Sequence, residues 1–129
     1  VHSRTGSFNV SNVAGNIILT ASSYSEQVFV RGFGGNYTGV SSTPYTASAS
    51  DYIIGVSYTS DTDIRLPGAS QVGAGGMLIL KDEYIGRVSG KITLSASVGD
   101  TIDNESYYIL TGSGPAISLY SNGANWFVF

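Results

Sequence analysis

The carboxyl-terminal end of the chain reads AISLYSNGANWFVF, residues 116–129, and this stretch decides the fold class. Ala116–Ser121 is a short run with Ile117, Leu119 and Tyr120 that is expected to form a strand. Asn122-Gly123 follows and favours a type I′ hairpin turn, in which both central residues have positive φ. Ala124–Phe129 then returns as a second strand. The stretch therefore predicts a β-hairpin that closes an all-β chain.

The returning strand carries large apolar side chains on both of its faces. Trp126 and Val128 point to one side, and Phe127 and Phe129 point to the other. Burying each such side chain stabilises the fold by roughly 1.5–3 kcal/mol, so exposure of either face to water is unfavourable. The second face is covered either by the chain's own core or by another copy of the chain. Under the second interpretation the interface residues are Trp126, Phe127 and Phe129.

The rest of the chain consists of short β-branched and aromatic runs divided by Gly, Ser, Asn and Asp. Only one short helical turn is expected, at Ala69–Val72. Other strands are expected at Ser7–Val10, Asn16–Ala21, Glu26–Arg31, Pro44–Ala49, Asp51–Tyr58, Asp63–Leu66, Gly76–Lys81, Lys91–Ser95 and Ser106–Thr111. The pattern predicts an antiparallel β-sandwich or a jelly-roll-like module of about 10–12 short strands.

Length and composition limit what kind of protein this is. The 129 residues fit a single domain, residues 1–129. Within it, a glycine-rich loop divides an N-terminal group of strands, residues 1–40, from the main unit. Charged residues are only 12% of the chain, against about 25% in ordinary soluble domains. The six basic residues are scattered and the net charge is −3, which argues against a nucleic-acid partner. No apolar run approaches the ~20 residues of a membrane-spanning helix, so no membrane insertion is expected.

The side chains that catalysis or metal binding needs are scarce. Cysteine is absent, and the one histidine, His2, stands near the start of the chain, which excludes a zinc set and a serine–histidine triad. Carboxylate pairs occur at Asp61 with Asp63, Asp82 with Glu83, and Asp100 with Asp103. All lie in expected turns, where aspartate is a common turn former. We therefore expect no enzyme, no metal and no cofactor, and keep a glycan hydrolase only as a weak alternative.

Six motifs between Tyr45 and Phe129 occur in a fixed order. They are SDYIIGV (50–56), DIRLPGA (63–69), LKD (80–82), KITL (91–94), GDTID (99–103) and SLYSNGANW (118–126). In this order the chain resembles a module of phage tail fibres, tailspikes and other viral fibre proteins. The sequence departs from the family pattern at one place, where Glu83-Tyr84-Ile85 intervenes between Lys81-Asp82 and Gly86. The resemblance therefore does not predict the conformation of this loop.

The resemblance implies a β-rich, usually trimeric module on the virion surface, outside the cell. Such a module binds a host-cell glycan or surface protein, or it locks the fibre end as a structural knob without a ligand. A capsid jelly-roll domain is a further alternative. Aromatic side chains suit receptor contact, because they offer a stacking face and, in tyrosine, a polar tip. The candidate contact residues are Phe33, Tyr37, Tyr58 and Tyr84.

Overall fold

The computed structural model describes residues 32–87 and 89–129. The chain divides into two units, residues 1–33 and 34–129, and all the elements below belong to the second unit. The three strands expected before Gly32 lie outside the described residues, as does His2.

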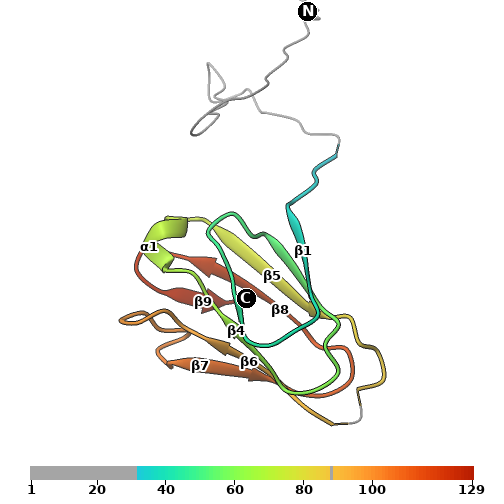
Figure 1. Ribbon diagram of the computed structural model, residues 1–129. Coiled ribbons are helices and arrows are strands. Elements are labelled where there is room, and N and C mark those ends of the chain that lie inside the picture. Colours follow the sequence, from blue (N-terminus) through green and yellow to red (C-terminus); the bar gives the residue numbers. More distant parts are fainter. Residues whose placement is uncertain (1–31, 88) are drawn as a thin grey trace, which may run out of the picture. The chain divides into compact units, whose positions relative to one another are not determined.

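Nine strands and one short helix form the described part, which confirms the all-β prediction. A five-stranded sheet has the order β1-β3-β5-β8-β9, and a four-stranded sheet has the order β2-β4-β6-β7. The two sheets form separate layers (Figure 1). The five-stranded sheet consists of β1 (Tyr37–Val40), β3 (Ile53–Val56), β5 (Met77–Asp82), β8 (Ala116–Ser121) and β9 (Trp126–Val128). The four-stranded sheet consists of β2 (Tyr45–Thr46), β4 (Thr62–Arg65), β6 (Ile92–Ser95) and β7 (Tyr107–Leu110), and the helix α1 spans Ala69–Val72.

The amino-terminal six strands alternate between the two sheets. Each sheet therefore receives every second strand, and β1, β3 and β5 run parallel in one sheet while β2, β4 and β6 run parallel in the other. Parallel neighbours need a long crossover, and here a strand of the opposite sheet supplies it. Antiparallel pairing is confined to β5–β8, β8–β9 and β6–β7. The expectation of a wholly antiparallel arrangement was wrong for the first six strands.

The buried faces of both sheets enclose one hydrophobic core. β5 and β8 show why, since buried and less buried positions alternate along each strand. Leu78 and Leu80 pair with Leu119 and Ile117 on the inner face of the larger sheet. The smaller sheet contributes Ile64, Ile92, Leu94 and Leu110 to the same cluster.

Trp126 closes this core from β9. Its side chain is 0% exposed, and its indole Nε1 donates to the carbonyl of Pro67 at 3.1 Å. Pro67 stands just before α1, whose Ala69 carbonyl accepts the Ser121 hydroxyl at 2.8 Å. These bonds fix α1, the expected helical turn, against the end of β8 (Figure 1).

One turn differs from the sequence prediction. β8 and β9 do form the expected hairpin, but a four-residue loop closes it through Asn122 N to Asn125 O, and Asn122 lacks a positive φ. The left-handed pair is instead Asp103-Asn104, with φ of 48° and 68°. Ile102 and Glu105 flank this pair and exchange two backbone hydrogen bonds, the pattern of a type I′ turn.

Candidate functional site

The outer face of the five-stranded sheet is apolar. Along its strands, every residue that points away from the core is uncharged except Lys81, whose ammonium group donates to the carbonyl of Gly114. We call this surface the apolar face, and it carries Tyr37, Ile53, Met77, Ile79, Tyr120, Phe127 and Phe129.

Strand register arranges these side chains in two rows. Met77, Tyr120 and Phe127 are successive partners in one row across β5, β8 and β9. The neighbouring row runs through Ile53, Ile79 and Ser118, and the backbone N–H of Phe129 bonds to the carbonyl of Ser118 at 3.0 Å. The Tyr120 ring stacks on Phe127 with centroids 5.5 Å apart, and the Phe129 ring lies 5.8 Å from it. The result is a continuous aromatic cluster on the outside of the sheet.

The predicted interface residues therefore divide by face. Phe127 is half-buried and Phe129 is 63% exposed, both on the apolar face, as the alternation of the final strand predicts. Trp126 lies on the opposite side of β9 and exposes no surface. It cannot contact another copy, because its own core encloses it completely, and we remove it from the candidate interface.

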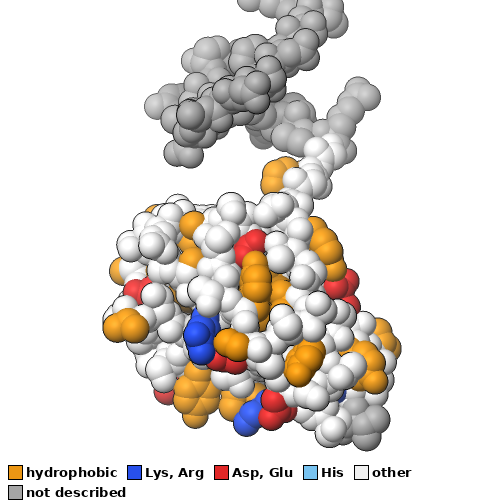
Figure 2. Space-filling model, in the orientation of Figure 1, with side chains coloured by type: hydrophobic (Ala, Val, Ile, Leu, Met, Phe, Trp, Pro, Cys, Tyr) orange, Lys and Arg blue, Asp and Glu red, His pale blue; other side chains and the backbone are white. Residues whose placement is uncertain are grey.

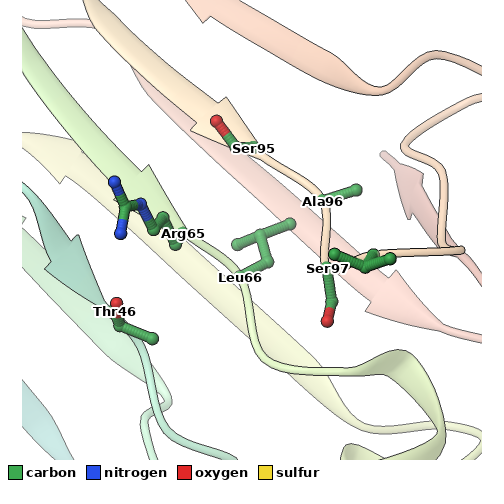
Figure 3. Close-up of a pocket in the computed structure, with 7 residues that line it drawn as sticks. Thr46, Arg65, Leu66, Ser95, Ala96 and Ser97 are labelled. Carbon is green, nitrogen blue, oxygen red and sulfur yellow. The ribbon is translucent and has the colours of Figure 1, made fainter.

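The outer face of the four-stranded sheet is polar, and it was missed by the sequence analysis. One cross-strand row spans all four strands, because Thr46 pairs with Arg65, Arg65 with Ser95, and Ser95 with Tyr107. Beside this row lies an open pocket of about 430 Å³, lined by Thr46, Arg65, Leu66, Ser95, Ala96 and Val98 among others. The labelled residues come from the neighbouring strands β2, β4 and β6 and from the segments that follow β4 and β6 (Figure 3). We call this surface the polar row.

Few charges interrupt the surface of the domain. Figure 2 shows orange hydrophobic side chains spread over a mostly white face with few blue or red groups. On the polar row, the one ion pair joins Arg65 Nε to Asp63 Oδ2 at 3.4 Å, and both side chains are largely exposed. Asp63 Oδ1 also accepts the Ser95 hydroxyl at 3.0 Å. The Arg65 side chain makes no other hydrogen bond within residues 32–87 and 89–129, so its Nη groups remain available.

The candidate receptor tyrosines Tyr37, Tyr58 and Tyr84 gather around the loop between β5 and β6. The Tyr37 hydroxyl donates to Glu83 at 2.5 Å, and this bond raises the pKa of the Tyr37 phenol above its ordinary value. A β-carbon at Gly55 would collide with Glu83, which explains the glycine beneath this pair. Tyr84 is 41% exposed and lies 5.7 Å from the Arg87 guanidinium. Tyr58 packs against the core, which leaves less of it available to a partner.

Phe33, the fourth candidate, is 78% exposed. It belongs to the other unit of the chain.

The same loop is held by a buried ion pair. Arg87 Nε donates to Asp82 Oδ2 at 2.7 Å and Arg87 Nη2 to Asp82 Oδ1 at 3.1 Å, with side chains 2% and 0% exposed. The guanidinium also donates to the carbonyls of Tyr58 and Ser60. Asp82 thus anchors the loop, and the sequence expectation of a turn aspartate was wrong at this position.

The other carboxylate pairs also make structural contacts. Asp61 Oδ1 accepts the Lys91 N–H, and Asp63, which lies in β4 rather than a turn, bonds Ser95. Asp100 Oδ2 accepts the N–H of Ala69 at 2.8 Å and so caps the start of α1, across the fold. Within the described residues, no group of three or more His, Cys, Asp or Glu side chains could hold a metal ion. No helix in that part of the chain is long and apolar enough to cross a membrane.

No protein-family model, curated protein or solved structure matches this chain. The expected resemblance to fibre modules accordingly rests on the order of the six sequence motifs alone.

Proposed function

We propose that this chain is a β-sandwich head module of a viral or phage fibre, which oligomerises and attaches the particle to a glycan or protein on the host cell. The apolar face carries the proposal. It holds seven apolar side chains in adjacent rows, and large exposed apolar patches on soluble proteins mark interaction sites. The motif order from Tyr45 to Phe129 supports the fibre context.

A second copy of the chain is the partner that fits this face. The charged groups at this face are Lys81 and the carboxylate of Glu83, which lies over Gly55 beside Tyr37. Both stand at one margin, away from Tyr120, Phe127 and Phe129, so the aromatic centres of two or three copies can meet without opposing like charges. Tyr120, Phe127 and Phe129 form the centre of the contact, because large aromatic side chains dominate the energy of interfaces. The trimer is the stoichiometry that we propose.

The oligomer is tested by the solution mass of the chain, measured by light scattering. We expect a trimer, and we expect F129S together with Y120S to give a folded monomer. The matched control is I109S, since Ile109 is 39% exposed on the outer face of the other sheet and its loss leaves the trimer intact. A wild-type chain that stays a single monomer at high concentration contradicts the proposal.

Attachment is a separate measurement. The trimer is added to host cells and to a glycan array, and saturable binding supports the attachment role. A trimer that binds neither supports the alternative of a structural knob. The apolar face is equally consistent with such a knob, because it accounts for association between copies and not for attachment to a host.

A further inference from the structure

We propose that the polar row on the four-stranded sheet is a binding site for a neutral sugar. This inference rests on the proposed attachment function and gives it a place and a ligand class. If copies associate through the apolar face, the outer face of the four-stranded sheet stays open to the surroundings. Attachment then has a surface of its own, separate from the surface used for assembly.

The row offers the groups that a sugar ring requires. Tyr107 is 55% exposed at one end and presents an aromatic face, on which the C–H face of a sugar packs. Ser95 lies next to Tyr107, and its hydroxyl already donates to Asp63 and is left to accept. Thr46 lies at the opposite end of the row, where its hydroxyl can donate and accept. Leu66, Ala96 and Val98 line the adjoining pocket with apolar surface, and Val98 is fully exposed. Mostly apolar walls with a few convergent polar groups are typical of small-molecule sites.

The Arg65–Asp63 pair selects the ligand class. Only the Nε of Arg65 donates to Asp63. This bond orients the guanidinium, and both Nη groups can still donate to a ligand. Each Asp63 oxygen accepts one bond, from Arg65 or Ser95, and keeps a lone pair. A sugar hydroxyl can accept from Arg65 and donate to Asp63. A carboxylate ligand, by contrast, is repelled by the Asp63 carboxylate beside the guanidinium, and no other basic side chain lies on the strands of this sheet.

The test is a titration of isotope-labelled full chain with glucose, galactose and mannose, followed by NMR. We expect at least one hexose to cause saturable shifts at Thr46, Arg65, Ser95 and Tyr107, with a Kd in the millimolar range that single weak contacts give, about 1 mM or above. Glucuronate and N-acetylneuraminate, which carry a carboxylate, should bind at least about tenfold more weakly, a difference of about 1.4 kcal/mol.

Variants locate the site. R65A and Y107A should each weaken binding about tenfold or more, and R65K should weaken it because lysine lacks the second forked donor. K91A is the matched control, because Lys91 precedes β6 at the end of the strand away from Ser95 and its loss should leave the shifts unchanged. Both Arg65 and Tyr107 are exposed, so the variants should fold, which the unchanged spectrum of the core confirms.

Three results overturn the inference: no saturable shift with any neutral hexose, tighter binding of the acidic sugars, or shifts that map to Tyr37 and Tyr84 instead. Host-cell binding separates this failure from failure of the proposed function. If R65A and Y107A trimers still attach to cells as the wild type does, the attachment role stands and the polar row is not its site.

Discussion

Asp82 and Asp51 are the buried carboxylates of the described part of the chain, and each holds a loop against a sheet. Asp82 takes the Arg87 guanidinium, whereas Asp51 accepts the Thr38 hydroxyl at 2.7 Å, the Tyr45 hydroxyl at 2.8 Å and the Ser48 N–H at 2.9 Å. The sequence could not indicate either contact. Both depend on segments that meet only after the strands have been distributed between the two sheets.

Replacing Arg87 with alanine should be strongly destabilising. The change leaves Asp82 buried without its counter-ion, and breaking a buried pair from one side typically costs about 3–5 kcal/mol. R65A is the matched control, because the Arg65–Asp63 pair is exposed and should contribute only about 0–1 kcal/mol. Urea unfolding at neutral pH measures both free energies. Equal losses in the two variants would contradict the anchoring role of Asp82.

Asp51 should make the fold sensitive to acid. Burial alone would raise the pKa of this carboxyl, but the hydrogen bonds from Thr38, Ser48 and Tyr45 outweigh it and hold the pKa below its ordinary value. Because the folded pKa is depressed, the stabilisation is complete above the unfolded value of about 3.9 and is lost as the pH falls through the folded pKa. We expect the free energy of unfolding to drop with pH below about 4.

The control for this pH dependence is a pair of variants. D51N should be less stable at neutral pH. It should also lose less of its remaining stability on acidification, because it no longer has the carboxylate that takes up a proton. E105Q removes an exposed carboxylate instead and should keep the wild-type pH profile. If D51N and the wild type have parallel profiles, the hydrogen bonds to Asp51 do not set the acid sensitivity.

Individual elements were predictable from the sequence to within a few residues at each end. The short β-favouring runs that predict Ala116–Ser121 and Lys91–Ser95 are local signals, and β8 and β6 follow them closely. β1 was missed, because its Tyr-Thr-Gly-Val sequence lies in a glycine-rich stretch that favours a loop. Turn types were less predictable, since Asn122-Gly123 has the preferred residues for a type I′ turn while Asp103-Asn104 has the geometry. In the β8–β9 hairpin, Asn122 Oδ1 instead accepts hydrogen bonds from the N–H groups of Ala124 and Asn125, and these bonds stabilise the four-residue loop.

The Asp103-Asn104 turn gives a prediction at this scale. Asn104 has φ of 68°, where asparagine and glycine are tolerated and a β-carbon without a local hydrogen bond is strained. N104A should therefore lower the free energy of unfolding by about 1–2 kcal/mol, and N104G should preserve it to within about 0.5 kcal/mol. Thermal and urea unfolding of both variants measure the difference. If N104A is as stable as N104G, the turn does not hold a left-handed residue in solution.

For the whole molecule, the sequence predicts which faces strands present but not how strands pair. Alternation alone assigned Phe127 and Phe129 to a common face of the final strand, and the structure shows that this face is the outer one, shared with Tyr120. The parallel pairing of the first six strands was not predictable, because period-two alternation is the same whichever sheet a strand joins. The polar row was missed for the same reason: Thr46, Arg65, Ser95 and Tyr107 come together only through that pairing.

The contrast between the two outer faces predicts how association responds to solution conditions. On the apolar face the charged groups Lys81 and Glu83 stand together at one margin, and the aromatic centre has no charge to be screened, so the mass of the assembled chain should not fall between about 0.05 and about 0.5 M NaCl. Cooling should weaken association, because the hydrophobic contribution decreases at low temperature. Light scattering across salt and temperature measures both trends. S118K, which places a charge between Ile79 and the Phe129 backbone, should dissociate the assembly by opposing like charges. A mass that falls with salt instead would indicate that ion pairs hold the copies together, and the Arg65–Asp63 side of the molecule would then be the face through which they meet.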